Sequence, residues 1–201
     1  MGYPCIFVRL YGCNLNCSYC DTSYAKKNFW EMSIEEIVRI CGQYKIRLVE
    51  ITGGEPLLQS ETPALAQSLI SRDYTVLVET NGSLDIGILR PGIRRIIDIK
   101  CPSSNESHNN RWENLGLLRD GDEIKFVIQN RADYEYALKV VEEHDLLAMG
   151  IPIHLSPVMD VLGPPLVAEW ILRDRLPLRL HLQLHKIIWP EGEPKFRVWR
   201  G

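Results

Sequence analysis

The amino-acid sequence predicts an α/β fold with a parallel β-sheet. Apolar, β-prone segments alternate along the chain with segments of helical period, the pattern of strands joined by crossover helices. Most strand segments are apolar on both faces, as buried parallel strands are. The length of 201 residues suits one domain but falls short of the roughly 250 that a complete eightfold barrel needs. An open doubly wound sheet and a partial barrel both fit these observations.

The individual elements are predicted from hydrophobic periodicity and from the capping and turn residues at their ends. Ser33 followed by Glu36 is a capping-box pattern that predicts the start of the first helix, and Pro63 suits the first turn of the second. Strands are expected over residues 5–10, 47–52, 75–79, 95–100, 123–128, 153–156 and 178–184. Helices are expected over residues 34–43, 62–71, 111–118, 133–143 and 166–173. We expect a single domain over residues 1–201, with a core of about 4–188 and a C-terminal tail over 189–201.

Composition argues against several classes of protein. The formal net charge of −3 and a pI near 6.0 do not suit a general nucleic-acid binder. No apolar run approaches the 18 or so residues of a membrane helix. The first twenty residues contain Arg9 and several cysteines, which is not the pattern of a secretory signal. We therefore expect a cytoplasmic protein without membrane or nucleic-acid partners.

Unusual polar segments directly follow the predicted strands. The carboxyl ends of parallel strands form one edge of a sheet, and active sites of α/β proteins lie there. These segments are therefore expected to converge on one mouth, although they are far apart in sequence. They comprise residues 13–20, 53–56, 79–82, 100–104, 129–130, 156–157 and 185–186.

The first of these segments carries a cysteine cluster. Cys13, Cys17 and Cys20 have the spacing C-x3-C-x2-C, and cytosolic cysteine clusters more often bind metal than form disulfides. Three thiolates from one loop can hold three corners of a 4Fe-4S cubane and leave its fourth iron open. A zinc knot completed by a distant His or Asp is the alternative, with nearby Asp21 as a candidate oxygen ligand. The remaining cysteines are expected to be small core hydrophobes: Cys5, Cys41 and Cys101.

These residues carry a resemblance to a known superfamily. The cysteine motif after the first strand, with Tyr19 before its last Cys and Gly53-Gly54-Glu55-Pro56 after the second strand, resembles the radical S-adenosylmethionine (SAM) superfamily. The resemblance covers nearly the whole chain. It implies a partial (β/α)6-type TIM barrel, a 4Fe-4S cluster and SAM bound at the open iron.

Further motifs carry a closer resemblance: FVRLYGCNL from Phe7, CDT from Cys20, TGGEP from Thr52, VETNG from Val78, DIK from Asp98 and LQLHK from Leu182. Together they resemble the 7-carboxy-7-deazaguanine synthase (QueE) family of queuosine and 7-deazapurine biosynthesis. The resemblance implies a lyase that converts 6-carboxy-5,6,7,8-tetrahydropterin to 7-carboxy-7-deazaguanine with loss of ammonia. Hydrogen abstraction at C6 by a SAM-derived radical begins the ring contraction, SAM is regenerated, and Mg²⁺ assists.

Site residues follow from the same resemblance. Arg9 and Thr52 are implied as substrate ligands, together with His185 and Pro190, and Thr22 is implied as the protein ligand to Mg²⁺. The residues implied as SAM contacts are Tyr19, Cys20, Asp21, Gly53, Gly54, Glu55, Glu79, Asn81, Asp98, Ile99, Lys100, Ser156, Pro157 and Val158.

Each of the weaker assignments has an ordinary structural reading. Arg9 could form a surface ion pair, and Thr22 could cap a loop. Asn81 followed by Gly82 is also an ordinary turn signal, and His185 could be a core or rim residue.

The chain also departs from the family pattern. In the family a Gln-Gly-Glu-Gly segment precedes the first strand and forms part of the substrate pocket, whereas Met1-Gly2-Tyr3-Pro4 stands here. A start placed too late, a shortened chain and a different substrate are the three explanations. The last gives room to an alternative, an activase that installs a glycyl radical on a partner protein. A non-catalytic iron–sulfur or zinc module is a further alternative. A homodimer and a reductant such as flavodoxin or ferredoxin are implied as partners.

Overall fold

A computed structural model of the chain describes residues 2–27 and 29–189. The strands are β1 Ile6–Leu10, β2 Leu48–Gly53, β3 Thr75–Thr80, β4 Arg94–Lys100, β5 Glu123–Ile128, β6 Ile153–Pro157 and β7 Arg179–Leu180. The α-helices are α1 Ile34–Cys41, α2 Thr62–Ile70, α3 Arg131–Glu143, α4 Pro164–Asp174 and α5 Leu184–Ile188. Short 3-10 helices lie between them, among them η1 Ser23–Lys26, η2 Pro56–Leu58 and η6 Trp112–Leu117.

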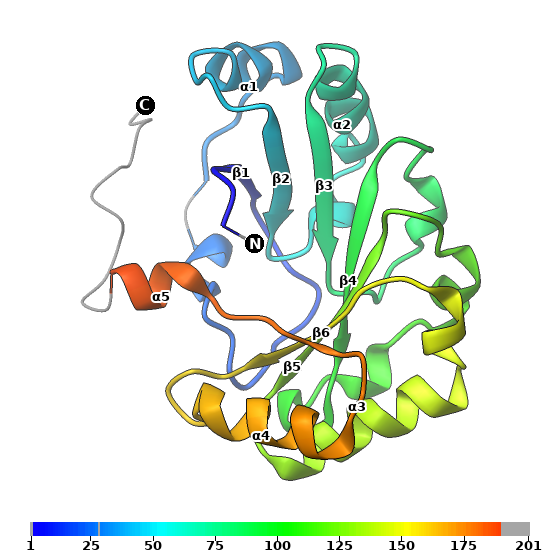
Figure 1. Ribbon diagram of the computed structural model, residues 1–201. Coiled ribbons are helices and arrows are strands. Elements are labelled where there is room, and N and C mark those ends of the chain that lie inside the picture. Colours follow the sequence, from blue (N-terminus) through cyan, green and yellow to red (C-terminus); the bar gives the residue numbers. More distant parts are fainter. Residues whose placement is uncertain (1, 28, 190–201) are drawn as a thin grey trace.

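The strands form one sheet in which every pairing is parallel and the order in space is the order in sequence, β1 to β7. A doubly wound sheet would reverse its strand order at a switch point. This sheet does not, so the partial barrel is confirmed. Figure 1 shows the sheet curving, with α1 to α4 along its outer side and α5 on the side that remains open.

Most predicted elements are present within a few residues of their expected ends. The capping box is formed: the Ser33 amide donates to Glu36 at 2.8 Å, and the Glu36 amide donates to the Ser33 hydroxyl at 3.2 Å. The segment over residues 111–118 is the 3-10 helix η6 instead of an α-helix. Cys41 and Cys101 lie in the core as expected, at 1% and 0% exposure.

The prediction of a last strand over residues 178–184 is wrong for most of that segment. Only Arg179 and Leu180 pair with β6, and the chain then turns into helix α5. The physical reason lies outside the segment itself. Gln183 donates a hydrogen bond to the Asp21 carboxylate at 2.7 Å, which draws the chain away from the sheet edge toward the cysteine loop.

The two faces of the sheet have different chemistry. Alternate residues of each strand pack under the helices and form the core, for example Val49 and Ile51 on β2, which are fully buried. The residues between them face the inside of the barrel, and many of these are charged. We call this inner side the lumen; its charged residues are Arg9, Glu50, Glu79, Arg94, Asp98, Lys100, Glu123, Lys125 and Arg179.

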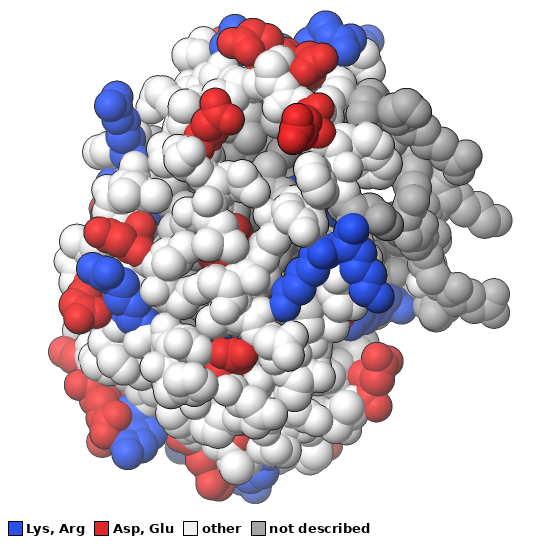
Figure 2. Space-filling model, turned by 180° about the vertical axis from the view of Figure 1, so that it is seen from behind, with Lys and Arg blue, Asp and Glu red and all other residues white. Residues whose placement is uncertain are grey.

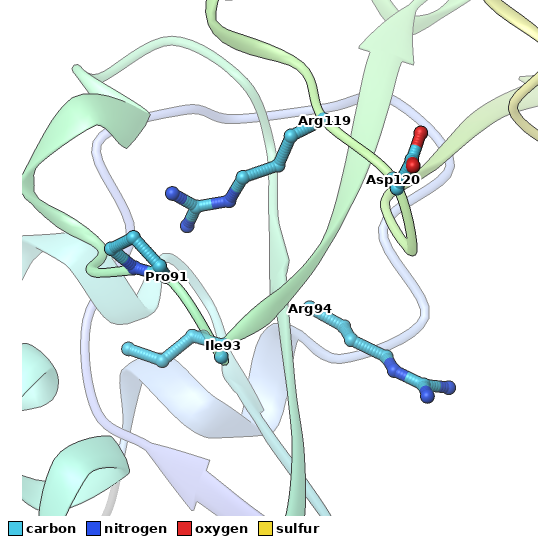
Figure 3. A pocket seen from close by; sticks show the side chains of 6 residues that line it. Pro91, Ile93, Arg94, Arg119 and Asp120 are labelled. Atoms are coloured by element: carbon cyan, nitrogen blue, oxygen red, sulfur yellow. The ribbon is translucent and has the colours of Figure 1, made fainter.

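A buried ion pair lies at the amino-terminal end of β4. The Arg95 guanidinium donates to the Asp122 carboxylate, and both side chains are 1% exposed. An open hollow lies at this end beside Arg94 and Arg119 (Figure 3). It is at the opposite end of the strands from the cysteine loop, so it does not belong to the candidate site.

Acidic and basic side chains are interspersed on the face seen in Figure 2. No helix among the described residues is both long enough and apolar enough to span a bilayer.

Candidate functional site

The cysteine loop leaves the carboxyl end of β1 and crosses the mouth of the barrel. Cys13 and Cys17 are partly buried, Cys20 is exposed, and all three thiols are free. The loop is anchored on both sides. The Ser18 amide donates to the Ser104 carbonyl at 3.0 Å, and the Gly12 amide donates to the Ala25 carbonyl at 3.1 Å. Leu15 is the buried apolar residue of the loop, at 4% exposure.

The loop fits an iron–sulfur cluster by its chemistry. Sulfur ligands of such clusters accept hydrogen bonds from nearby amides. Cys13 Sγ already accepts one from the Leu15 amide at 3.4 Å and another from Asn81 Nδ2 at 3.8 Å. Burial raises the pKa of the Cys17 thiol, Lys100 lowers it, and Asp98 and the other two loop cysteines raise it further.

A cubane takes its thiolates on different irons, whereas a zinc knot gathers them on one ion. Among the residues that the structure describes, no group of three His, Cys, Asp or Glu side chains is placed to hold a single ion.

The double glycine after β2 is required by the chain itself. A Cβ on Gly54 would lie 2.2 Å from the Gly12 carbonyl oxygen and 2.6 Å from Cys13 Cβ. A Cβ on Gly53 would lie 2.2 Å from the Leu10 carbonyl oxygen. The Glu55 amide donates to the Gly12 carbonyl at 2.8 Å. The glycine turn therefore seats the start of the cysteine loop, in addition to leaving backbone open for a ligand.

Glu55 supports the site with a carboxylate that does not face the mouth. The side chain is fully buried, and its oxygens accept hydrogen bonds from the Leu57 amide at 2.9 Å, the Thr80 hydroxyl at 2.8 Å and the Asn81 amide at 2.7 Å. Burial raises its pKa, while these three donors lower it. The Glu55 side chain thus joins the loops after β2 and β3. The turn over residues 53–56 can therefore contact SAM only through its backbone atoms.

Asn81 continues this connection to the cysteine loop. Its side-chain amide donates to Asn14 Oδ1 at 3.1 Å, and its Oδ1 accepts from the Ser83 amide at 3.0 Å. The side chain is 6% exposed. Asn81 therefore forms the turn and also contacts the cysteine loop, and its contact with SAM stays a prediction.

An unsatisfied oxygen lies in the lumen beneath the loop. Asp98 Oδ2 pairs with Lys100 Nζ at 2.8 Å, whereas Asp98 Oδ1 is buried and has no hydrogen-bond partner among the described residues. A buried acceptor without a partner is costly, so it is a natural place for a ligand donor. This fits the expectation that the strand-end motif of β4 contacts SAM.

Not every residue of the later motifs points into the lumen. Ile99 is 4% exposed and belongs to the hydrophobic core, and Pro157 is buried on the same outer face of the sheet. Ser156 faces the lumen, where its hydroxyl lies 3.4 Å from His181 Nδ1. For Ile99 and Pro157 the predicted cofactor contact is therefore possible only through backbone atoms. Val158 is half-buried, and its amide donates to the Ile128 carbonyl at 2.9 Å.

Arg9 and Thr52 are placed together by the register of β1 and β2, which pairs them directly. Arg9 is exposed on the open side of the lumen, its guanidinium donates to the Gly53 carbonyl at 3.4 Å, and it lies over the Tyr24 ring at 5.6 Å. It makes no ion pair among the described residues, which argues against the surface-pair interpretation. Its guanidinium is available for a carboxylate ligand.

Tyr19 and Thr22 flank the last cysteine. The Tyr19 hydroxyl donates to the Val127 carbonyl at 3.1 Å, so the side chain fixes the loop to β5. Thr22 precedes η1 but makes no side-chain cap, and its hydroxyl lies 3.8 Å from Cys20 Sγ. The loop-cap interpretation of Thr22 is therefore wrong, and its oxygen is open to a ligand.

Helix α5 brings the end of the described chain to the same mouth. Lys186 Nζ lies 3.3 Å from the Asp21 carboxylate, which also accepts the hydrogen bond from Gln183. His185 is exposed on this helix, next to Lys186. Pro190 lies outside the described residues.

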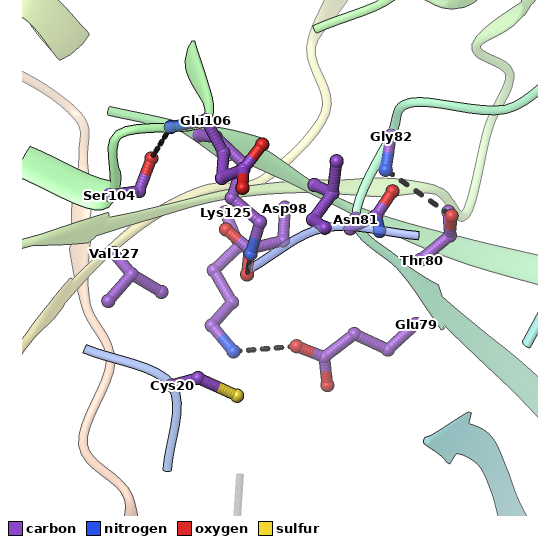
Figure 4. Close-up of polar contacts among 12 residues, drawn as sticks. Cys20, Glu79, Thr80, Asn81, Gly82, Asp98, Ser104, Glu106, Lys125 and Val127 are labelled. Carbon is purple, nitrogen blue, oxygen red and sulfur yellow. Dashed lines mark hydrogen bonds and ion pairs between the residues drawn. The ribbon is translucent and has the colours of Figure 1, made fainter. Parts of the chain in front are cut away.

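The lumen also contains charged residues that the motifs did not indicate. Lys125 Nζ pairs with Glu79 Oε1 at 2.6 Å, as Figure 4 shows, and Glu50 lies beside Glu79. Deeper in the lumen His154 Nε2 lies 2.7 Å from Glu123. A charged residue in the middle of a predicted buried strand was the available signal, because such a residue must find a partner.

Comparisons with known proteins agree with this geometry. Residues 7–156 match the family model of the radical SAM superfamily. The 7-carboxy-7-deazaguanine synthase of Chlorobaculum tepidum is 44% identical over 94% of this chain and 86% of its own. The 7-carboxy-7-deazaguanine synthase of Koribacter versatilis is 42% identical over 94% of this chain and 89% of its own length.

Among solved structures, Streptococcus suis SuiB bound to SAM aligns with a TM-score of 0.62 at 16% identity, over 95% of this chain. The chain spans about half of that structure, 53% of its length, so the likeness concerns the fold. The match to the family model and the sequence identity to the synthases show more than the fold, because they identify the family. The chain therefore belongs to the radical SAM superfamily and, within it, to the 7-carboxy-7-deazaguanine synthase family of enzymes.

Proposed function

We propose that the chain is a lyase that converts 6-carboxy-5,6,7,8-tetrahydropterin to 7-carboxy-7-deazaguanine with loss of ammonia. The observation that carries the proposal is the open, charged lumen directly beneath the cysteine loop, with the guanidinium of Arg9, which forms no ion pair with a described residue, on its open side. A lumen of this kind suits a small polar ligand that carries a carboxylate.

The described residues divide the work in a simple way. Cys13, Cys17 and Cys20 would hold the 4Fe-4S cluster, which together with SAM would supply the radical chemistry for hydrogen abstraction. Asp98 Oδ1, which has no partner among the described residues, would accept a hydrogen bond from SAM, and this would remove the cost of its unsatisfied state.

The substrate is held on the β1 side of the lumen. Arg9 binds its carboxylate in bidentate fashion, and Thr52, its partner in the register, donates a hydroxyl. His185 on α5 adds a contact from the rim. The cysteine loop and α5 border the mouth, where they exclude water from the reacting centre.

Several further features belong to the same proposal and rest on the resemblance alone. They are Mg²⁺ at Thr22, SAM contacts from Tyr19, Asp21 and Glu79, a flavodoxin or ferredoxin as reductant, a homodimer, a cytoplasmic location and a single radical SAM domain with its core at about 4–188.

An anaerobic product assay tests the proposal. The reconstituted protein is given SAM, a reductant, Mg²⁺ and 6-carboxytetrahydropterin, and mass spectrometry looks for 7-carboxy-7-deazaguanine. Arg9→Lys keeps the charge but loses the bidentate fork, so KM is expected to rise by at least about tenfold while SAM binding stays unchanged. Cleavage of SAM without the ammonia-loss product would overturn the substrate assignment and favour another radical SAM reaction, such as glycyl-radical activation.

A further inference from the structure

The middle cysteine of the loop, Cys17, is held from the side of β4. The residues before and after it both donate hydrogen bonds to the segment that follows this strand. The Asn16 amide donates to the Glu106 carboxylate at 2.7 Å, and the Ser18 amide donates to the Ser104 carbonyl at 3.0 Å. The backbone on both sides of Cys17 is therefore fixed to the loop after β4.

Glu106 is the side chain among these anchors. The amide and the hydroxyl of Ser18 both donate to backbone carbonyls, those of Ser104 and Ser103. A backbone carbonyl is present whatever residue stands at its position. The acceptor for Asn16 exists only because residue 106 has a carboxylate. Glu106 is thus the contact through which a choice of residue type fixes the loop at this point.

The carboxylate of Glu106 is itself held in place. Its Oε2 accepts a hydrogen bond from Asn109 Nδ2 at 2.6 Å, and its backbone amide donates to the Ser104 hydroxyl at 3.0 Å (Figure 4). Ser104 is fully buried, and its hydroxyl donates to the Cys101 carbonyl at 2.6 Å. Both carboxylate oxygens therefore accept N–H donors, as an ionised carboxylate does, and the acceptor for Asn16 is preorganised.

The position of Cys17 also determines that of Cys20. The Cys20 amide donates to the Cys17 carbonyl at 3.2 Å, which closes a turn between the two cysteines. Cys13 is placed from the other side of the mouth, by the glycine turn after β2 and by Asn81. Two of the three cysteines therefore depend on the loop after β4. A cubane requires all three thiolates at matching positions.

We propose that Glu106 is a positioning residue for the iron–sulfur cluster, which acts through the Asn16 amide to place Cys17 and Cys20 for ligation. The inference rests on the cluster of the proposed function and is independent of the substrate. Partners that orient the ligands of a metal site typically contribute about 10–100-fold in metal affinity, so the effect is measurable.

The same contact places a negative charge beside the cluster. The Asn16 nitrogen is bonded to its own Cα, and consecutive Cα atoms are about 3.8 Å apart, so Glu106 Oε1 lies within about 8 Å of Cys17 Cα. Glu106 forms no ion pair with a described residue that would offset this charge. A nearby negative charge disfavours an added electron, so Glu106 should lower the reduction potential of the cluster.

Iron release tests the positioning role without turnover. The reconstituted protein is incubated anaerobically with a ferrous chelator, and the rate of iron release is followed by absorbance. Glu106→Ala removes the acceptor for Asn16, so release should be faster by about tenfold or more. Glu106→Gln keeps an acceptor oxygen at the same reach, so its rate should stay close to that of the wild type. Glu142→Ala, at an exposed position on α3, is the matched control and should not change the rate.

Calorimetry of the cluster-free protein separates positioning from a general structural role. Glu106 is only partly buried, so Glu106→Ala should lower Tm by no more than roughly 2–4 °C. Release from Glu106→Ala at the wild-type rate would overturn the proposal. A larger loss of Tm together with loss of the cluster, neither of them restored in Glu106→Gln, would also overturn it.

A second variant decides the question if Glu106→Ala does not fold. Asn109→Ala leaves the carboxylate in place but removes the bond to its Oε2. Release should then be faster than in the wild type, because the acceptor for Asn16 is no longer held. A wild-type rate in Asn109→Ala would contradict the preorganisation of Glu106 and overturn the proposal.

A redox titration followed by electron paramagnetic resonance gives a readout that a structural role would not move. Glu106→Gln removes the charge but keeps an acceptor, so the midpoint potential of the cluster should become more positive. Glu142→Gln removes a charge at an exposed position on α3 and should leave the midpoint unchanged. An unchanged or more negative midpoint in Glu106→Gln would overturn the placement of this charge beside the cluster.

Failure of this inference and failure of the proposed function are distinguishable. A wild type that binds the cluster but makes no 7-carboxy-7-deazaguanine loses the proposed substrate, while the release rates still decide the role of Glu106. A wild type that makes the product, with the same release rate in Glu106→Ala, keeps the proposed function and loses the role of Glu106.

Discussion

Replacing Gly54 with alanine should displace the cysteine loop. The added Cβ would lie 2.2 Å from the Gly12 carbonyl oxygen, whereas ordinary contacts begin near 3.4 Å. The difference, 3.4 − 2.2, is 1.2 Å, and it must be taken up by backbone on either side because no flexible side chain is available to move. Cys13 Cβ, at 2.6 Å from the new methyl group, would be pushed in the same direction.

The cost can be bounded from general values. Overpacking typically destabilises a protein by about 1–3 kcal/mol. For a chain of about 200 residues each kcal/mol lowers Tm by roughly 2–4 °C, so a fall of about 2–12 °C is expected. The larger effect should be on cluster assembly. If Cys13 moves by about 1 Å, its sulfur can no longer bind the same cluster as Cys17 and Cys20 with correct geometry.

Two measurements check this prediction. Iron and sulfide content with electron paramagnetic resonance of the reduced protein reports cluster assembly, and calorimetry of the apo-protein reports Tm. Gly116→Ala is the matched control, since a Cβ there meets nothing within 4 Å, and it should behave as the wild type. Full cluster content and an unchanged Tm in Gly54→Ala would refute the argument that Gly54 seats the loop.

Three further predictions concern buried carboxyl groups. Glu55→Gln replaces an acceptor oxygen by a donor in front of existing donors, so it should cost about 1–3 kcal/mol in urea unfolding and reduce cluster content; an unchanged midpoint would contradict this. Asp122→Asn leaves Arg95 charged and unpaired at 1% exposure, so unfolding should become easier by about 3–5 kcal/mol, and a loss below about 1 kcal/mol would refute the role of the pair. Burial raises the pKa of Glu50 from 4.5 to about 8 on folding, so its contribution to stability is fully present below about pH 4.5 and is lost as the pH rises through about 8. The Tm of Glu50→Gln should therefore rise relative to that of the wild type as the pH increases from 6 to 9. A Tm difference independent of pH would contradict the raised pKa of Glu50.

The architecture was predictable because it depends on local pattern. Runs such as that over residues 5–10 are apolar and β-prone, and the helices between them carry caps such as Ser33. The last strand was mispredicted because alternation over residues 178–184 is a local signal, whereas the partner that draws the chain out of the sheet, Asp21, is 162 residues away from Gln183.

The site was predictable in part for the same reason. The cysteine spacing and the glycine turn are contiguous motifs, so their meeting at the mouth follows from strand order. Lys125 and Glu50 stand alone in their strands and form no motif. Their importance depends on contacts with Glu79 between strands, which the sequence does not state.

The sequence by itself determined the parallel α/β architecture and the cysteine loop, because periodicity and spacing are properties of neighbouring residues, and its motifs carried the resemblance to the family. Only the tertiary structure decided that the strands follow one another in a partial barrel and that Glu55 is a buried connection instead of a ligand-facing acid. It also decided that Lys125 and Glu79 pair across the lumen. These outcomes depend on which side chains the curvature and register of the sheet place in one lumen, and on the charge that each must then balance.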